Sequence, residues 1–190
     1  DRKIAGGERV QDALIRNFRF VVARAKPYAE APGVSRLIRL HPNHFAGNWR
    51  DNRISLGGGR IPYDVNAALV PAALRAIDAL APHMGTVEAQ ELGQAARTMV
   101  APWSQAHQHF VVQVPGAKRR LDAYLDALRA SKALALPPPA KAMAAFPAVA
   151  LEADGAPVRI MHSDIALRMV LGQPSAAELD QAIRLALTPF

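Results

Sequence analysis

Residues 47–66 read GNWRDNRISLGGGRIPYDVN, and no other stretch of the chain is as dense in polar and aromatic side chains. Three successive glycines, Gly57 to Gly59, interrupt the stretch, and an apolar, alanine-rich run begins at its end. Glycine lets a backbone approach a ligand closely, whereas an apolar run with helical spacing predicts a packed helix. We therefore expect residues 47–66 to form a loop that carries binding or reactive groups into the start of a helix.

The helix expected after this loop has apolar residues on two faces. Asp64 has the position and side chain of an N-cap, and the helix is predicted to end at about Leu80. One apolar stripe consists of Val65, Leu69, Ala73, Ile77 and Leu80. Val70 and Leu74 make a second face, so the helix needs cover on both sides, as in a layered helical domain. Pro71 removes a backbone donor and is expected to bend the helix.

Further helical patterns predict a mainly α chain built from consecutive helix pairs. They cover residues 8–26, 87–109, 117–134, 163–172 and 175–187. Pro27 and Pro32-Gly33 are expected to end the first of these helices, and Pro102 is expected to kink or divide the second. Thr86, Ser163 and Ser175 are the predicted N-caps of later helices.

A small β excursion is expected among these helices. Residues 36–40 and 110–114 have the pattern of short strands, and residues 149–151 and 158–160 form the clearest hairpin, with its turn at Asp154-Gly155. Three consecutive prolines at 137–139 exclude regular helix. We therefore predict one helical domain over residues 1–190, with an internal junction near 135–147.

The composition narrows the classes of partner. The net charge of +7 comes from 23 Lys and Arg against 16 Asp and Glu, but the cations are scattered. The cluster at 118–120 opens a helix that also carries Asp122 and Asp126, which indicates a solvated face rather than a nucleic-acid surface. We found no apolar run long enough to cross a bilayer, so no membrane span is expected.

Neither a metal nor another cofactor is expected. The chain has no cysteine, which excludes disulfides and thiolate ligands but does not distinguish cytoplasm from periplasm. The histidine pairs His41/His44 and His107/His109 have no carboxylate at convincing ligand spacing. Gly57 to Gly59 lack the Lys-Ser/Thr ending of a phosphate-binding loop.

The central stretch resembles the six-hairpin glycosidases, the group that includes trehalases, processing α-glucosidases and the glucosidase part of glycogen-debranching enzymes. The resemblance rests on WRDN at 49–52, the glycines, and YDVN at 63–66 opening a helix, and it covers about residues 47–74. It implies paired helices arranged in an α/α toroid. A chain of this length would hold about half of the ring, so the resemblance implies a partial toroid from a longer protein.

The resemblance also implies roles for individual residues. Asp51 matches the general acid, and Trp49 the aromatic residue beside it. The remaining residues of the expected sugar site are Arg50, Asn52, Arg60, Tyr63, Asp64 and Asn66. Glycoside hydrolysis also needs a second carboxylate, for which the sequence shows no motif; Glu88 and Glu91 fit a solvated helix face better.

The same residues also have purely structural interpretations, and these stay open. Asp51 can cap a turn or pair with Arg50 or Arg53, Trp49 can belong to the core, and Asp64 can be a helix cap. The preferred function is a carbohydrate-active hydrolase acting on an oligosaccharide or glycoside; the alternative is a non-catalytic carbohydrate-binding or helical assembly module. A partial ring would leave apolar edges, so we also expect association with further segments of the protein or with itself.

Overall fold

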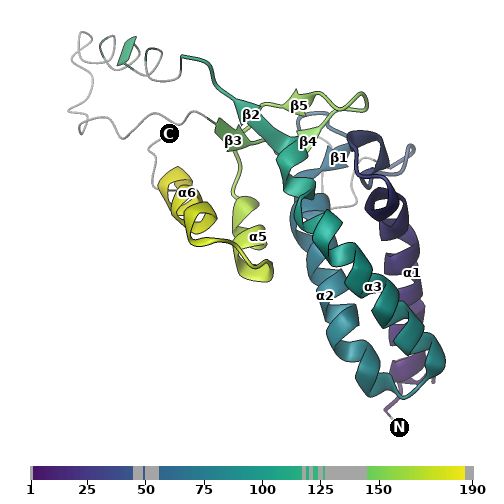
Figure 1. Ribbon diagram of the computed structural model, residues 1–190. Coiled ribbons are helices and arrows are strands. Elements are labelled where there is room, and N and C mark those ends of the chain that lie inside the picture. The colour runs from purple at the N-terminus through teal and green to yellow at the C-terminus, as the bar shows by residue number, and fades with distance from the viewer. Residues whose placement is uncertain are drawn as a thin grey trace.

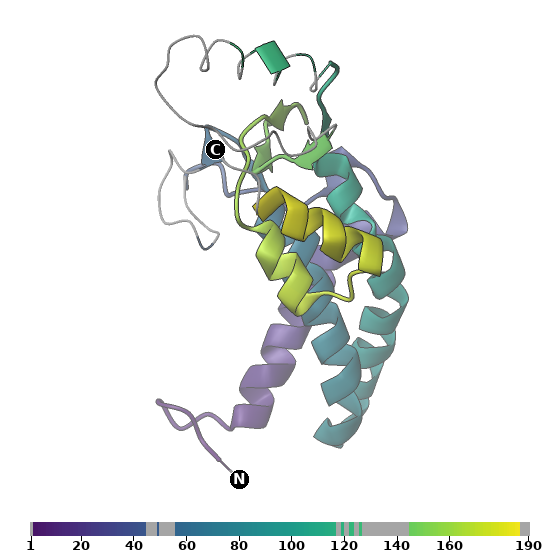
Figure 2. The same ribbon diagram turned by 90° about the vertical axis from the view of Figure 1, so that its left-hand side faces the viewer.

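The computed structural model describes residues 2–44, 49, 56–116, 119, 122, 123, 126 and 145–186. The described part is mainly helical, as predicted, with two small antiparallel sheets. Its helices are α1 (Val10–Glu30), α2 (Val70–Leu80), α3 (Val87–Ser104), α5 (Ile165–Leu171) and α6 (Ala176–Ala186). Shorter helical turns are η1 (Val34–Arg36), η3 (Val65–Leu69), η4 (Ala81–Met84) and η5 (Ala106–Phe110). Helices α1, α2 and α3 pack together as a bundle, and α5 and α6 form a separate helical hairpin (Figures 1 and 2).

Helix α1 runs three residues beyond Pro27 and ends at Glu30, so Pro27 is wrong as a stop signal, whereas the predicted stop at Pro32-Gly33 is confirmed. The last turn contains Ala25 and Tyr28, whose side chains are 0% and 1% exposed. A proline removes only one backbone donor, and its cost here is offset by the burial of its neighbours in the core.

The helix that follows the central loop begins differently from the prediction. Asp64 already has helical dihedral angles (φ −54°, ψ −46°) and makes no capping bond, so its assignment as an N-cap is wrong. The first turns form the π-helical segment η3, and Pro71 follows it near the start of α2. This wider turn lies directly before Pro71, which cannot make the usual i→i−4 bond; the predicted bend at Pro71 stays a prediction.

The observed boundaries of α3 agree more closely with those predicted from the sequence. Gly85, with φ 66°, ends the preceding turn, and the Thr86 hydroxyl accepts a hydrogen bond from the Ala89 amide at 3.2 Å. The predicted cap is confirmed. Beyond Pro102 the α-helix continues only to Ser104 before the 3₁₀ turn η5, so the predicted division is confirmed as well.

Two sheets close one end of the bundle (Figure 1). Their strands are β1 (Ile61–Pro62), β2 (Val111–Gln113), β3 (Ala145–Pro147), β4 (Ala150–Leu151) and β5 (Pro157–Val158). One sheet has the order β1-β4-β5 and the other pairs β2 with β3. The predicted hairpin is β4–β5, and its turn uses Gly155 at φ 94° and a 2.9 Å bond from the Ala156 amide to the Asp154 carboxylate.

The strand predicted at residues 36–40 is wrong. Arg36 ends the turn η1, and residues 38–40 then run extended without forming a strand of either described sheet. Both backbone groups of Ile38 bond instead to the side chain of Asn66. The helix predicted at 117–134 and the junction near 135–147 fall largely outside the described residues.

The two helices of the hairpin, α5 and α6, have different N-terminal caps. Asp164, not Ser163, occupies the first cap position, and it makes no capping bond. Ser175 is the cap of α6, as predicted. Its hydroxyl accepts from the Glu178 amide at 3.3 Å, while the Glu178 carboxylate accepts from the Ser175 amide at 2.8 Å, which together make a capping box.

The main core lies between the three bundle helices and reaches β1 and β4. Its largest fully buried side chains include Trp103, Tyr28, Tyr63 and Phe110. A smaller cluster of Leu40, Leu56, Val149, Ala150 and Val158 lies at the sheet. The start of the helix after the central loop is therefore held between the bundle core and the sheet.

The 19 helix residues Val65–His83 are long and apolar enough to span a membrane, with a mean hydropathy of 1.2 in an 18-residue window. This result depends on length and composition alone. About 44% of that window is buried within the protein, and Leu74 and Ile77 belong to the main core. Core helices commonly have this character, and the absence of a membrane span stays a prediction.

Apolar side chains are exposed on the α5–α6 hairpin. Val170 is 80% exposed, Ile183 50% and Leu179 43%. Exposed apolar surface of this kind favours association. The association expected from the partial-ring interpretation stays a prediction.

Candidate functional site

The predicted catalytic residue Asp51 and its neighbours Arg50 and Asn52 lie outside the described residues. The structure describes the other predicted site residues, which are Trp49, Arg60, Tyr63, Asp64 and Asn66. All of them lie close to the start of the helix that follows the central loop.

Trp49 is 54% exposed, whereas Asp64 is completely buried. The Trp49 amide donates to the Asp64 carboxylate across 3.4 Å, longer than a typical N–H···O bond. This contact positions the Trp49 backbone over the first helical turn. The side chain that sequence analysis assigned to a cap therefore contacts the central loop instead.

Asn66 is buried and connects two segments of the fold. Its side-chain oxygen accepts from the Ile38 amide at 2.8 Å, and its nitrogen donates to the carbonyls of Ile38 and Pro62, each at 2.9 Å. An amide side chain has one acceptor oxygen and two N–H donors, and all of these groups are engaged within the protein. Asn66 thus holds the extended segment after η1 against the helix start.

Arg60 shapes the turn that precedes the central loop. Its guanidinium group donates to the carbonyls of His41 at 2.7 Å and of Leu40 and His44 at 3.3 Å each. The backbone carbonyl of Arg60 also accepts from the Leu40 amide at 2.8 Å. Its expected contact with a sugar stays a prediction, but several of its donors already stabilise this turn.

Tyr63 packs in the core rather than at the surface. It is 2% exposed, and its ring meets Phe110 and His162 edge-on, with centroids 5.4 Å and 4.9 Å away. Burial raises the pKa of its phenol to about 12; the positive charge of Arg168 opposes this shift, and nearby carboxylates add to it. The phenol therefore remains neutral across the physiological range of pH.

His162 and Asp164 are also buried, with side chains 2% and 0% exposed. The His162 Nδ1 accepts from the Asp164 amide at 3.1 Å and lies 3.6 Å from the Asp164 carboxylate. Ser163, between them in sequence, is exposed. The adjacent Ser, His and Asp therefore do not gather in the manner of a catalytic triad.

A polar cluster that sequence analysis missed joins the helical hairpin to the bundle; we call His107, Arg168, Ser175 and Glu178 the Glu178 cluster. The Glu178 carboxylate accepts from Arg168 at 2.6 Å and lies 3.6 Å from the His107 Nε2. Burial lowers the pKa of His107, and the positive charge of Arg168 adds to that effect. Arg168, Ser175 and Glu178 are close in sequence, but His107 is distant, and the predicted cap at Ser175 was the only sequence signal for the cluster.

Because of the Glu178 cluster, we expect the free energy of unfolding to decrease at acidic pH. Partial burial alone would raise the pKa of Glu178, but hydrogen bonds from the Ser175 amide, Arg168 and the Ser175 hydroxyl outweigh it and lower the pKa to about 2. A carboxyl group with a lowered folded-state pKa stabilises the fold above its ordinary value of 4.5, and this contribution is lost as pH falls toward 2.

Glu178→Gln is therefore expected to flatten the decline in the free energy of unfolding between about pH 4.5 and 2. Urea-induced unfolding at a series of pH values measures this dependence. Glu152→Gln, which changes an exposed carboxyl group at the β4–β5 turn, is the matched control. Parallel curves for wild type and Glu178→Gln would exclude Glu178 as a source of the acid dependence.

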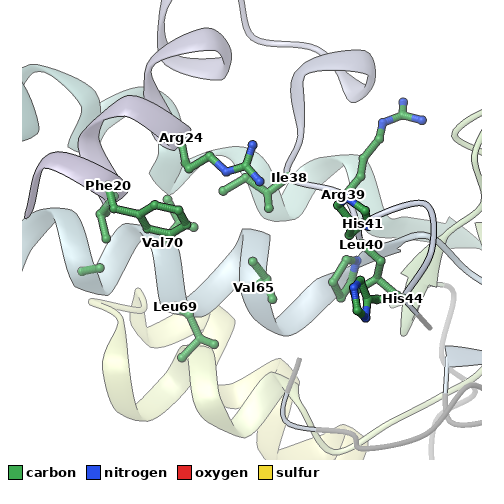
Figure 3. A pocket seen from close by; sticks show the side chains of 13 residues that line it. Phe20, Arg24, Ile38, Arg39, Leu40, His41, His44, Val65, Leu69 and Val70 are labelled. Carbon is green, nitrogen blue, oxygen red and sulfur yellow. The ribbon is translucent and has the colours of Figure 1, made fainter. Parts of the chain in front are cut away.

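A pocket of about 430 Å³ opens between α1, the segment of residues 38–44 and the helix start (Figure 3). Its apolar wall includes Phe20, Val21, Val65, Leu69 and Val70. Its basic lining residues are Arg24, Arg39, His41 and His44. Two of the wall residues, Pro62 and Val65, flank the Tyr63-Asp64 pair in sequence, so the pocket adjoins the predicted site.

The histidine pairs considered as metal ligands make ring contacts and hydrogen bonds within the protein. The rings of His41 and His44 meet edge-on with centroids 5.1 Å apart. His109 Nε2 lies 3.1 Å from the Tyr28 hydroxyl, and His107 Nδ1 lies 2.9 Å from the Ser104 carbonyl. Across the residues that the structure describes, no three His, Cys, Asp or Glu side chains form a group able to hold a metal ion.

Comparison with known proteins adds no relative to this description. No family model, curated protein or solved structure matches the chain.

Proposed function

We propose that the protein is a carbohydrate-active hydrolase of the six-hairpin glycosidase type, or part of one, with Asp51 as the general acid. The observation that carries this proposal is the placement of Trp49. Its side chain is 54% exposed while its amide contacts the buried carboxylate of Asp64 at the helix start. An exposed aromatic ring on a positioned loop can offer a flat apolar face to a sugar ring.

The proposed chemistry assigns one task to the central loop. Asp51 protonates the leaving oxygen of the glycosidic bond, and a second carboxylate activates a water molecule. In an inverting enzyme these two carboxyl groups lie about 6.5–9.5 Å apart. A general acid must be protonated when it donates, so a nearby negative charge or partial burial must raise its pKa. In this proposal Asp51 faces the sugar beside Trp49, and Arg50 and Arg53 point elsewhere.

The helical scaffold is compatible with the proposal. Helices α2 and α3 are consecutive in the chain and are joined by the short turn η4. Helices α5 and α6 form a second pair of consecutive helices in contact. Consecutive helix pairs are the building units of an α/α toroid. We propose that these helices belong to part of such a ring.

A non-catalytic binding or assembly module is the second candidate, and the burial of the YDVN residues favours it. Tyr63 packs between Phe110 and His162, and Asn66 bonds to Ile38 and Pro62. These contacts account for both residues through folding alone. In this alternative Trp49 binds a sugar without hydrolysis, so affinity is present and turnover is absent.

Trp49→Ala tests the feature that both sugar-binding candidates share. Loss of a central aromatic contact is expected to weaken binding of maltose or trehalose by at least about tenfold, or 1.4 kcal/mol. Isothermal titration calorimetry measures the change. The control is Phe20→Ala, which removes an aromatic side chain that is 65% exposed on α1. Equal sugar affinity in wild type and Trp49→Ala would remove Trp49 from the proposed site.

A further inference from the structure

We propose that the pocket between α1 and the start of α2 binds a small organic anion with an apolar body, such as a medium-chain carboxylate. Neither the sequence motifs nor the proposed glycosidase activity assigns a ligand to this pocket. The proposal rests on its volume, its exposed apolar wall and the charges around it. It is independent of sugar binding at Trp49.

The wall of the pocket exposes apolar surface in a concave region. Phe20 is 65% exposed and Leu69 is 39% exposed, and they lie with Val65 and Val70 around the same cavity (Figure 3). The volume of about 430 Å³ falls within the range of small-molecule sites, roughly 300–1,000 Å³. An apolar ligand body would remove these side chains from water, which is favourable in proportion to the area covered.

Arg24 is the proposed partner of the anionic group. Three other arginines of α1 and its N-terminal cap pair with carboxylates: Arg9 with Asp12, Arg16 with Glu8, and Arg19 with Glu88. Within the part of the chain that the structure describes, Arg24 has no such ion pair. Its guanidinium carbon lies 5.8 Å from the centroid of the Phe20 ring (Figure 3). A guanidinium group in this position can bind a carboxylate through two parallel hydrogen bonds.

The other polar side chains that line the pocket also favour a negatively charged ligand. His41 Nδ1 accepts from the Asn43 amide at 3.3 Å, so in the neutral ring Nε2 carries the proton and can donate. Arg39 points away from the other lining side chains in Figure 3 and donates to the Ala153 carbonyl at 2.7 Å, so it contributes charge at longer range. No Asp or Glu is among the lining residues in the described part of the chain. The pocket therefore combines an apolar wall with a positive potential.

A monomeric ligand suits this geometry better than a membrane surface. The apolar side chains line a concave, half-open pocket, and Arg24 projects beside it (Figure 3). A flat lipid surface would need an exposed apolar face that projects outward. The proposed ligand therefore places its apolar chain over Val65, Leu69 and Val70 and its carboxylate at Arg24.

Titration calorimetry with decanoate and with the neutral analogue decanol, both below their aggregation concentrations, tests the proposal. Decanoate is expected to bind at one site, at least tenfold more tightly than decanol. Arg24→Gln is expected to reduce decanoate affinity to the level of decanol and to leave decanol affinity unchanged. Leu69→Glu, which places an acidic group in the apolar wall, is expected to weaken both ligands at least tenfold.

The matched control is Lys26→Gln, which removes the same charge from the same helix but changes a residue outside the pocket. It should leave both affinities unchanged. Equal affinity for decanoate and decanol, or unaltered decanoate binding by Arg24→Gln, would overturn the proposal. Binding to phosphatidylglycerol vesicles without binding of monomeric decanoate would overturn it as well. Trp49→Ala should retain decanoate binding, which separates this result from the test of sugar binding.

Discussion

Replacing Trp103 with alanine is expected to lower the free energy of unfolding by about 3–5 kcal/mol, the cost of removing a large aromatic side chain from a core. Trp103 is 0% exposed, and its ring packs against Tyr28 with centroids 4.5 Å apart. Its indole N–H donates to the Ala25 carbonyl at 2.9 Å. The substitution leaves a cavity between α1 and α3 and removes a buried hydrogen bond at the same time.

Urea-induced unfolding followed by far-ultraviolet circular dichroism measures this loss without relying on tryptophan emission. Trp49→Ala is the matched control because it makes the same substitution at a side chain that is 54% exposed. Its expected cost is below about 1 kcal/mol. Similar losses for the two variants would contradict the placement of Trp103 at the centre of the bundle.

Replacing Asp51 with asparagine is expected to reduce glycoside turnover by about a hundredfold or more, since positioned acid catalysis contributes that much. The prediction applies to a form of the protein that contains both catalytic carboxylates. Asparagine retains the size of the side chain but cannot donate the proton required by the leaving oxygen. Release of glucose from trehalose, maltose or an aryl α-glucoside measures the rate.

Asp12→Asn is the control for this experiment. It makes the same change on α1, at an exposed residue that pairs with Arg9. Full activity in this control and unchanged secondary structure in Asp51→Asn would attribute the loss to chemistry. Unchanged turnover in Asp51→Asn would remove Asp51 from the mechanism, and loss of folding would identify it as a structural residue.

Apolar periodicity predicted the bundle helices because a helix that packs in a core must repeat its apolar residues. The local signals at Thr86 and Ser175 were equally informative, since a cap needs only one side chain and the amide that follows it. Pro27 was misread because burial of Ala25 and Tyr28 overrides a local preference. Asp64 was misread because its hydrogen-bond partner, Trp49, lies in a loop whose path the sequence does not specify.

Very short strands, and contacts between residues distant in sequence, could not be predicted. Strands β1 and β3 contain two and three residues, too few to show an alternating pattern. Asn66 bonds across 28 positions to Ile38, and the Glu178 cluster joins α5 and α6 to η5. Such contacts depend on tertiary packing, so neither spacing nor residue type could predict them. Of the two tryptophans, Trp49 is exposed and Trp103 is buried, and the sugar contact predicted for Trp49 stays a prediction.

The most direct test of the proposed function is a sugar titration followed through the indole N–H signals in a proton–nitrogen NMR spectrum. The chain has two tryptophans, one exposed and one buried, so each protein molecule contains its own control. Maltose or trehalose is expected to shift the Trp49 signal saturably and to leave the Trp103 signal in place. A Trp49 signal that does not move at saturating concentrations of any α-glucoside would contradict the assignment of this loop as a carbohydrate site.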